Sequence, residues 1–179
     1  LARQVTEDLE TVGHMAMAMQ IAAFAVMGAQ GLLAAALPVV GRAASRADRR
    51  LRFYPWLVTL ITIFVFGAAI LAAFSYGESV VPAVMGPGFA PSAALLAPAF
   101  LVGGMMILPV GFWQILVARK HTWCGAVASW SGALVLLVLL PPLVRMEGVA
   151  GALAAAAIAW FLRAIILILW AIVALRADR

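Results

Sequence analysis

The sequence predicts an all-α, polytopic transmembrane helix bundle that forms a single domain over residues 1–179. Hydrophobic residues make up 66% of the chain, charged residues make up 11%, and the mean hydropathy is +1.12. This composition is too apolar for a water-soluble domain, which needs a polar shell. The apolar residues fall in long runs, and lipid offers the backbone no hydrogen bonds, so each run is expected to be helical.

Five apolar runs are long enough to cross a membrane. One crossing takes about 20 residues, because the hydrocarbon core is roughly 30 Å thick and a helix rises about 1.5 Å per residue. The predicted spans are residues 12–40, 54–76, 91–118, 123–143 and 149–175.

Glycine, proline and aromatic residues set the predicted limits of these spans. Tyr54 and Tyr76 flank the second span, where amphipathic rings favour the headgroup level. The stretch MGPGFAPS, residues 85–92, predicts a turn. Pro109 predicts a kink inside the third span, and the pair Pro141-Pro142 is expected to end the fourth.

The connectors predict the orientation of the chain. Basic residues gather after the first, third and fifth spans, and acidic residues lie mainly in the other connectors. The basic set is Arg42, Arg46, Arg49, Arg50, Arg52, Arg119, Lys120, Arg176 and Arg179, and the other side holds Glu7, Asp8, Glu10, Glu78 and the turn with Arg145 and Glu147. Since cytoplasmic loops carry excess arginine and lysine, we expect the N-terminus outside and the C-terminus in the cytoplasm.

Small residues repeat every four positions in the last two spans. They are Gly125, Ser129 and Ala133 in the fourth span and Gly151, Ala155 and Ala159 in the fifth. Such ridges let helix backbones approach closely, so the two spans are predicted to pack as a hairpin, although alanine-rich helices also produce this spacing by chance.

Arg163 is the main candidate functional residue. It lies in the apolar run AWFLRAIILILW, thirteen residues before Arg176, with no acidic partner among its helical neighbours. An arginine at the bilayer centre costs from about 2.5 to more than 10 kcal/mol, so we expect Arg163 to face a water-filled cavity or the bundle interior. The alternative is an arginine that caps carbonyl groups or pairs with an acid from another helix.

Two glutamines are the other candidates for a substrate pathway. Gln30 in the first span and Gln114 in the third carry large amides that must find partners in lipid. His14 is expected near the outer interface as a wetted surface residue.

Residues for other chemistry are missing from the apolar runs. No carboxylate lies in the core of any span, there is no phosphate-binding glycine loop, and Cys124 is the one cysteine. The sequence therefore predicts no catalytic residues, no metal site, no cofactor and no enzymatic activity. The positive charges sit in short connectors, which favours contact with lipid headgroups over nucleic acid.

Three stretches resemble the polysaccharide-exporting flippases of the multidrug/oligosaccharidyl-lipid/polysaccharide exporter superfamily. The longest, residues 74–123, is similar to a family segment with a GPGF turn and a closing Q-x-L-x-A-R stretch. ALPVVGRAASRADRRLRFY resembles the P-x-x-S-R-x-x-x-x-G-D loop, with Asp48 where the acid of that motif falls. LLPPLVRMEGVAGALAAAAIAWFLRAI resembles the L-I-P-x-x-G-x-x-G-A-A passage, without its isoleucine but with Gly151 at the G-A-A glycine.

The resemblance implies a fragment of a bacterial cytoplasmic membrane protein with 12 to 14 helices, of which these spans are the eighth to twelfth. Its partners would be membrane lipid, a lipid-linked saccharide substrate and the missing N-terminal helices. Three alternatives stay open: a drug/cation antiporter of the same superfamily, a polytopic membrane glycosyltransferase, and a scaffold subunit that does not transport.

Overall fold

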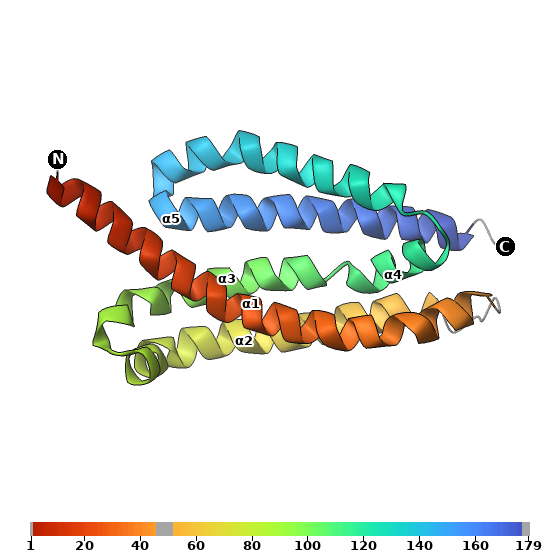
Figure 1. Ribbon diagram of the computed structural model, residues 1–179, viewed down its shortest axis with the longest axis horizontal. Coiled ribbons are helices and arrows are strands. Elements are labelled where there is room, and N and C mark those ends of the chain that lie inside the picture. Colours follow the sequence, from red (N-terminus) through yellow and green to blue (C-terminus); the bar gives the residue numbers. More distant parts are fainter. Residues whose placement is uncertain (1, 46–51, 177–179) are drawn as a thin grey trace.

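The computed structural model describes residues 2–45 and 52–176, and in these ranges the chain is helical except at short turns, with no strand (Figure 1). The prediction of an all-α protein is confirmed. The elements are α1 (Ala2–Ser45), α2 (Tyr54–Met85), the 3-10 helix η2 (Pro87–Ser92), α3 (Ala93–Ile107), α4 (Val110–Ala118) and α5 (Trp123–Arg176). Four helical stretches of the described chain are long and apolar enough to cross a membrane: Glu10–Ala43, Tyr54–Met85, Pro87–Ala118 and Trp123–Leu175.

The helix α5 folds back on itself at Gly148. A straight helix of its 54 residues would be about 80 Å long, far more than one membrane crossing needs. Gly148 has φ 59° and ψ −129°, a conformation that favours glycine, and Figure 1 shows two antiparallel arms that meet there. We call residues 123–147 the first arm and residues 149–176 the second arm.

The prediction that Pro141-Pro142 ends the fourth helix was wrong. Both prolines lie inside the first arm, and the helix continues for a further turn before it reverses at Gly148. Proline is tolerated within apolar helices when neighbouring groups satisfy the freed backbone, whereas the reversal needs a positive φ, which proline cannot adopt.

Two other limits of the predicted spans also change. The second helix ends at Met85 and not at residue 76, because Gly77 and Pro82 are both accommodated inside α2. The chain turns at Gly86, which has φ 98°, so the turn predicted for residues 85–92 is confirmed. The kink predicted at Pro109 is also confirmed, since it separates α3 from α4.

The element formed by α3 and α4 is the centre of the fold. Within Pro87–Ala118, half of the residues in the most apolar 18-residue segment are buried. In the corresponding segments of the other three long helices, only 11 to 22% of the residues are buried. In Figure 1 the two arms of α5 lie on one side of it and α2 lies on the other, while α1 crosses α3 from the upper left and then runs beside α2. Buried residues of α1, α2 and α3 form one core cluster, and buried residues of α4 and both arms of α5 form another.

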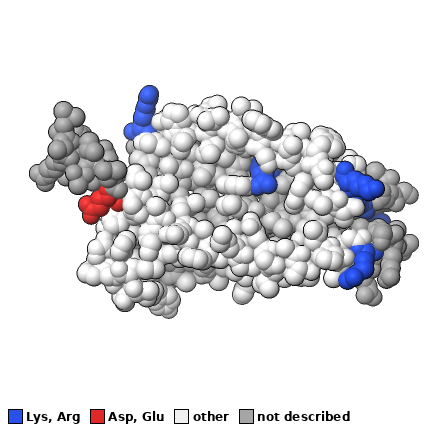
Figure 2. Space-filling model, viewed as in Figure 1, with Lys and Arg blue, Asp and Glu red and all other residues white. Residues whose placement is uncertain are grey.

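Charged side chains lie mainly at the two ends of this bundle (Figure 2). The end that holds the start of α2 and the end of α4 carries the basic residues Arg42, Arg52, Arg119 and Lys120. The opposite end holds the Gly148 reversal with Arg145 and Glu147. The predicted connector residues Arg46, Asp48, Arg49 and Arg50 lie outside the described residues. The described basic connectors thus share one end, as the positive-inside pattern requires.

Candidate functional site

Among the basic residues that the structure describes, Arg163 is the one that lies far from both ends of the bundle. It is in the second arm of α5, fifteen residues after Gly148 and thirteen before Arg176, or about 20 Å from either end at the standard helical rise. Figure 2 shows one basic patch in the middle of a face whose other described charged side chains lie near its ends. Ile158 of the same arm is on its exposed apolar side, and Arg163 is about 140° away from Ile158 around the helix. Arg163 therefore points away from that exposed side.

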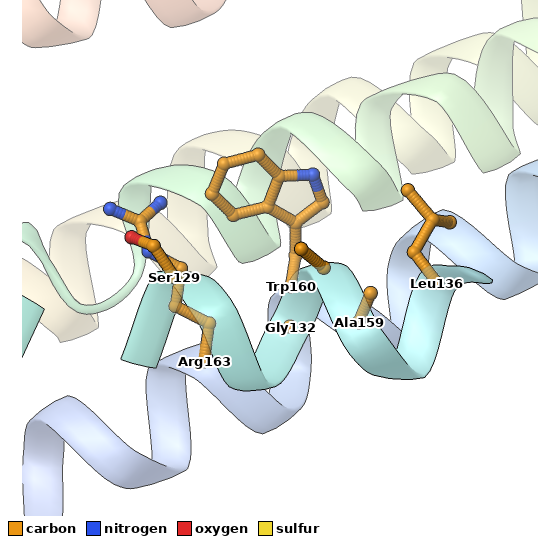
Figure 3. Close-up of a pocket in the computed structure, with 7 residues that line it drawn as sticks. Ser129, Gly132, Leu136, Ala159, Trp160 and Arg163 are labelled. Atoms are coloured by element: carbon orange, nitrogen blue, oxygen red, sulfur yellow. The ribbon is translucent and has the colours of Figure 1, made fainter. Parts of the chain in front are cut away.

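The side chain of Arg163 lines a cavity of about 360 Å³ between the two arms of α5 (Figure 3). Four residues of the first arm and three of the second form its walls. These are Ser129, Gly132, Ala133 and Leu136, and Ala159, Trp160 and Arg163. The walls are apolar except at the guanidinium group, the Ser129 hydroxyl and the indole nitrogen, so Arg163 supplies the one charge.

The guanidinium group lies over a neighbouring indole ring. Its Cζ atom lies 4.6 Å from the ring centroid of Trp160, which precedes Arg163 by one helical turn. The Nε atom of Arg163 is buried without a hydrogen-bond partner, and in the described part of the chain no acid forms an ion pair with the group. The described chain therefore leaves the charge of Arg163 uncompensated, apart from the attraction of the indole face.

Close approach of the two arms shapes the cavity. A Cβ atom added to Gly132 would lie 3.1 Å from the carbonyl oxygen of Ala159 and 3.6 Å from the Cβ atom of Arg163. A Cβ atom added to Gly151 would overlap the backbone of Leu143 near the reversal. The two arms therefore pack as a hairpin, as predicted, with glycines at the closest contacts.

The predicted ridge on the first arm needs a correction. Gly151, Ala155 and Ala159 are buried, as that prediction requires, but Ser129 and Ala133 are exposed toward the cavity. The face of the first arm that meets the second passes instead through Ala128 and Gly132. Gly125 packs against α4, where an added Cβ atom would overlap the ring of Trp113.

The structure places Gln114 in a different environment from Arg163. Its side chain, on α4, is 5% exposed and accepts a hydrogen bond from the Tyr54 hydroxyl of α2. Its amide nitrogen donates to the carbonyl oxygen of Leu33 of α1 at 2.5 Å. Gln114 thus links three helices, and it is not among the residues that line the Arg163 cavity.

Gln30 is on an exposed face of α1 and does not line this cavity either. The face of α1 that packs on α3 passes through Ala22 and Val26. Gln30 follows Val26 by four residues, about 40° around the helix, yet its own side chain is exposed. The structure therefore does not bring the three predicted pathway residues to one place.

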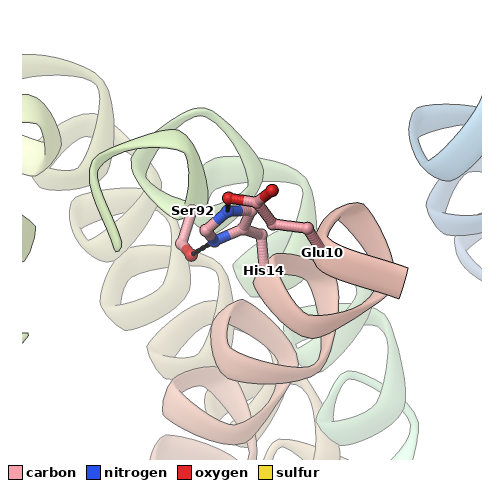
Figure 4. A network of polar contacts seen from close by, with 3 residues as sticks. All are labelled: Glu10, His14 and Ser92. Carbon is pink, nitrogen blue, oxygen red and sulfur yellow. Dashed lines mark hydrogen bonds and ion pairs between the residues drawn. The ribbon is translucent and has the colours of Figure 1, made fainter. Parts of the chain in front are cut away.

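His14 is more constrained than the prediction of a wetted surface residue. Its Nδ1 atom lies 3.0 Å from the hydroxyl oxygen of Ser92, which is fully buried, and its Nε2 atom lies 3.8 Å from a carboxylate oxygen of Glu10 (Figure 4). The ring also contacts Phe89 edge-on. These contacts link α1 to η2 at the end of the bundle opposite the basic connectors.

Two residues of the Arg163 cavity were missed in the sequence. Trp160 could have been found, because a residue three positions before Arg163 lies on the same side of a helix. Gly132 could not, since its contact with Ala159 depends on the register of the two arms. Among the described residues, no three His, Cys, Asp or Glu side chains come together as a metal site.

Comparison with known proteins leaves the site to be interpreted from its own chemistry. No protein-family model matches the chain, and neither a curated protein nor a solved structure matches it. What the cavity offers is a guanidinium group with in-plane donors in an apolar setting, and such a group binds carboxylate and phosphate oxygens strongly.

Proposed function

We propose that the protein is a membrane transporter that moves a lipid-linked oligosaccharide, or exports a polysaccharide, across the cytoplasmic membrane by alternating access. The observation that carries the proposal is Arg163, an arginine without an acidic partner in the described chain, in a cavity halfway along an apolar helix. Its proposed role is to attract the pyrophosphate group that joins the saccharide to its lipid.

The proposed topology has five crossings, with each arm of α5 as a separate one. Each arm exceeds the roughly 20 residues that a crossing takes, and the reversal at Gly148 returns the chain to the basic end. The N-terminus of this region would be outside and the C-terminus in the cytoplasm, with the basic connectors inside.

The broken third helix supports a transporter over a static scaffold. Transporters commonly place interrupted helices beside their substrate sites. Here Leu108 and Pro109 interrupt the helix between α3 and α4, and the Thr59 hydroxyl of α2 donates to the carbonyl oxygen of Leu108 at 3.2 Å. An antiporter for cations would use acids inside the spans, and the positive charge of Arg163 favours an anionic substrate instead.

The test is export by the full-length protein after substitution of Arg163. We expect Arg163→Ala and Arg163→Gln to reduce export strongly while membrane abundance stays normal, because removing an uncompensated charge from an apolar region does not destabilise the fold. The matched control is Arg145→Ala, which removes an exposed arginine at the Gly148 reversal and should leave export unchanged. Normal export by both Arg163 variants would remove this residue from the mechanism and the proposal with it.

A further inference from the structure

We infer that Trp160 is a positioning residue, which holds the guanidinium group of Arg163 so that its terminal nitrogens meet a phosphate or pyrophosphate group end-on. The inference rests on the proposed function and deepens it by adding a second residue to the anion site. It also states which edge of the guanidinium group the anion contacts.

The first step is the contact between the two side chains. Trp160 and Arg163 are on the same helix, one turn apart, and Cζ lies 4.6 Å from the ring centroid. Both side chains are half-buried and line the same cavity. A cation over an indole face is attracted by the ring, and the other cavity walls are formed mainly by small apolar side chains, which offer the cation no charged partner.

The second step is the division of the guanidinium group into a face and an edge. Stacking on an aromatic ring uses the face of the planar group, and the N–H donors lie in its plane. In the proposed arrangement the face of the guanidinium group lies against the indole, so the indole and an anion do not compete for the same part of Arg163. In Figure 3 the two terminal nitrogens extend past the indole ring, near the end of the cavity that holds Ser129.

The third step is the burial of Nε. This atom is buried without a partner, so the side edge of the guanidinium group that includes Nε is closed to a ligand. The two terminal nitrogens form the other edge, which presents two parallel donors. Such an edge matches two oxygens of one phosphate group, and a planar fork discriminates in favour of phosphate and carboxylate over spherical anions.

The fourth step is the entropic cost of fixing a freely rotating arginine side chain when a ligand binds. The side chain has many rotamers, and each that is lost on binding weakens the complex. In the described chain the indole is the partner that restricts the guanidinium group before a ligand arrives. Leucine at position 160 would keep apolar volume but remove this restraint, whereas phenylalanine would keep an aromatic face.

The experiment is equilibrium binding of geranylgeranyl pyrophosphate to the full-length protein in lipid nanodiscs, with geranylgeraniol as the uncharged reference. We expect Trp160→Leu to weaken pyrophosphate binding by about 3- to 30-fold, Trp160→Phe to weaken it less, and neither to change binding of the alcohol. Trp130→Leu is the matched control, because Trp130 is 72% exposed on the first arm and does not line the cavity.

A double-mutant cycle separates positioning from a structural effect. If Trp160 acts through Arg163, Trp160→Leu causes no further loss in an Arg163→Gln background. Additive losses, or Trp160→Leu binding as tightly as the wild type, would overturn the inference and leave the proposed function standing. Wild-type protein that binds the pyrophosphate no better than the alcohol would overturn both.

Discussion

A Cβ atom at Gly132 would lie 3.1 Å from the carbonyl oxygen of Ala159, so a glycine sets the distance between the two arms of α5 beside the Arg163 cavity. The neighbour is a backbone atom, which yields only if the arms move apart. The spacing of the arms beside the cavity therefore depends on this glycine, and its substitution tests the hairpin directly.

We expect Gly132→Ala to lower the free energy of unfolding by about 1 kcal/mol and Gly132→Val to lower it by about 1 to 3 kcal/mol, because overpacking separates the arms. The measurement is thermal or denaturant unfolding of the purified protein in detergent. Gly67→Ala is the matched control, since an added Cβ atom there meets nothing within 4 Å. Equal stability of the Gly132→Val variant and the wild type would show that the arms are not packed at this point.

A second substitution concerns the reversal of α5. Gly148→Ala forces an L-residue into φ 59° and ψ −129° and should cost about 1 to 3 kcal/mol of stability. The readouts are the yield of folded protein in the membrane and its melting temperature. Gly88→Ala provides the comparison, because Gly88 has no positive φ and open space around it. A Gly148→Ala variant as stable as the Gly88→Ala variant would mean that the chain does not reverse at Gly148.

The three-helix contact of Gln114 predicts a structural phenotype. Gln114→Leu removes both hydrogen bonds and leaves the Tyr54 hydroxyl and the Leu33 carbonyl oxygen without this partner, at an expected cost of about 1 to 3 kcal/mol. Gln30→Leu, on an exposed face, should not change stability. A fluorescence-based melting assay compares the two variants. If Gln114→Leu instead melts normally and loses only transport, Gln114 belongs to the substrate pathway as its sequence position predicted.

The proposed five crossings predict the accessibility of two loops. In a Cys124→Ala background, cysteine at the exposed Met146, next to the Gly148 reversal, should react with a membrane-impermeant maleimide in intact cells. Cysteine at Lys120, in the turn before α5, should react only after the cells are permeabilised. Labelling of both positions from the same side would rule out the crossing by the first arm.

The helical class was predictable because apolar length is a local property of the sequence. Arg163 could likewise be singled out from one charge in an apolar run. The end of the fourth helix was misplaced because Pro141 and Pro142 look like terminators, while the need for a positive φ at Gly148 arises from the packing of the two arms. The local sequence pattern therefore predicted which stretches are helical more accurately than it predicted where each helix ends.

The role of Gln114 could not be predicted for a different reason. Its partners Tyr54 and Leu33 are 60 and 81 residues away in the chain, and no spacing rule connects positions so far apart. The same holds for the contact of His14 with Ser92, which spans 78 residues. Trp160 is the opposite case, because its single-turn spacing from Arg163 was visible in the sequence.

The most direct measurement is chemical restoration of the charge at position 163 in the full-length protein. An Arg163→Cys variant in the Cys124→Ala background should lose export, and reaction with a water-soluble methanethiosulfonate that adds an ammonium group should restore part of it. A neutral methanethiosulfonate of similar size should react equally and restore nothing. Failure of the cysteine to react, or equal recovery with both reagents, would contradict a cation that meets an anionic substrate in a water-accessible cavity.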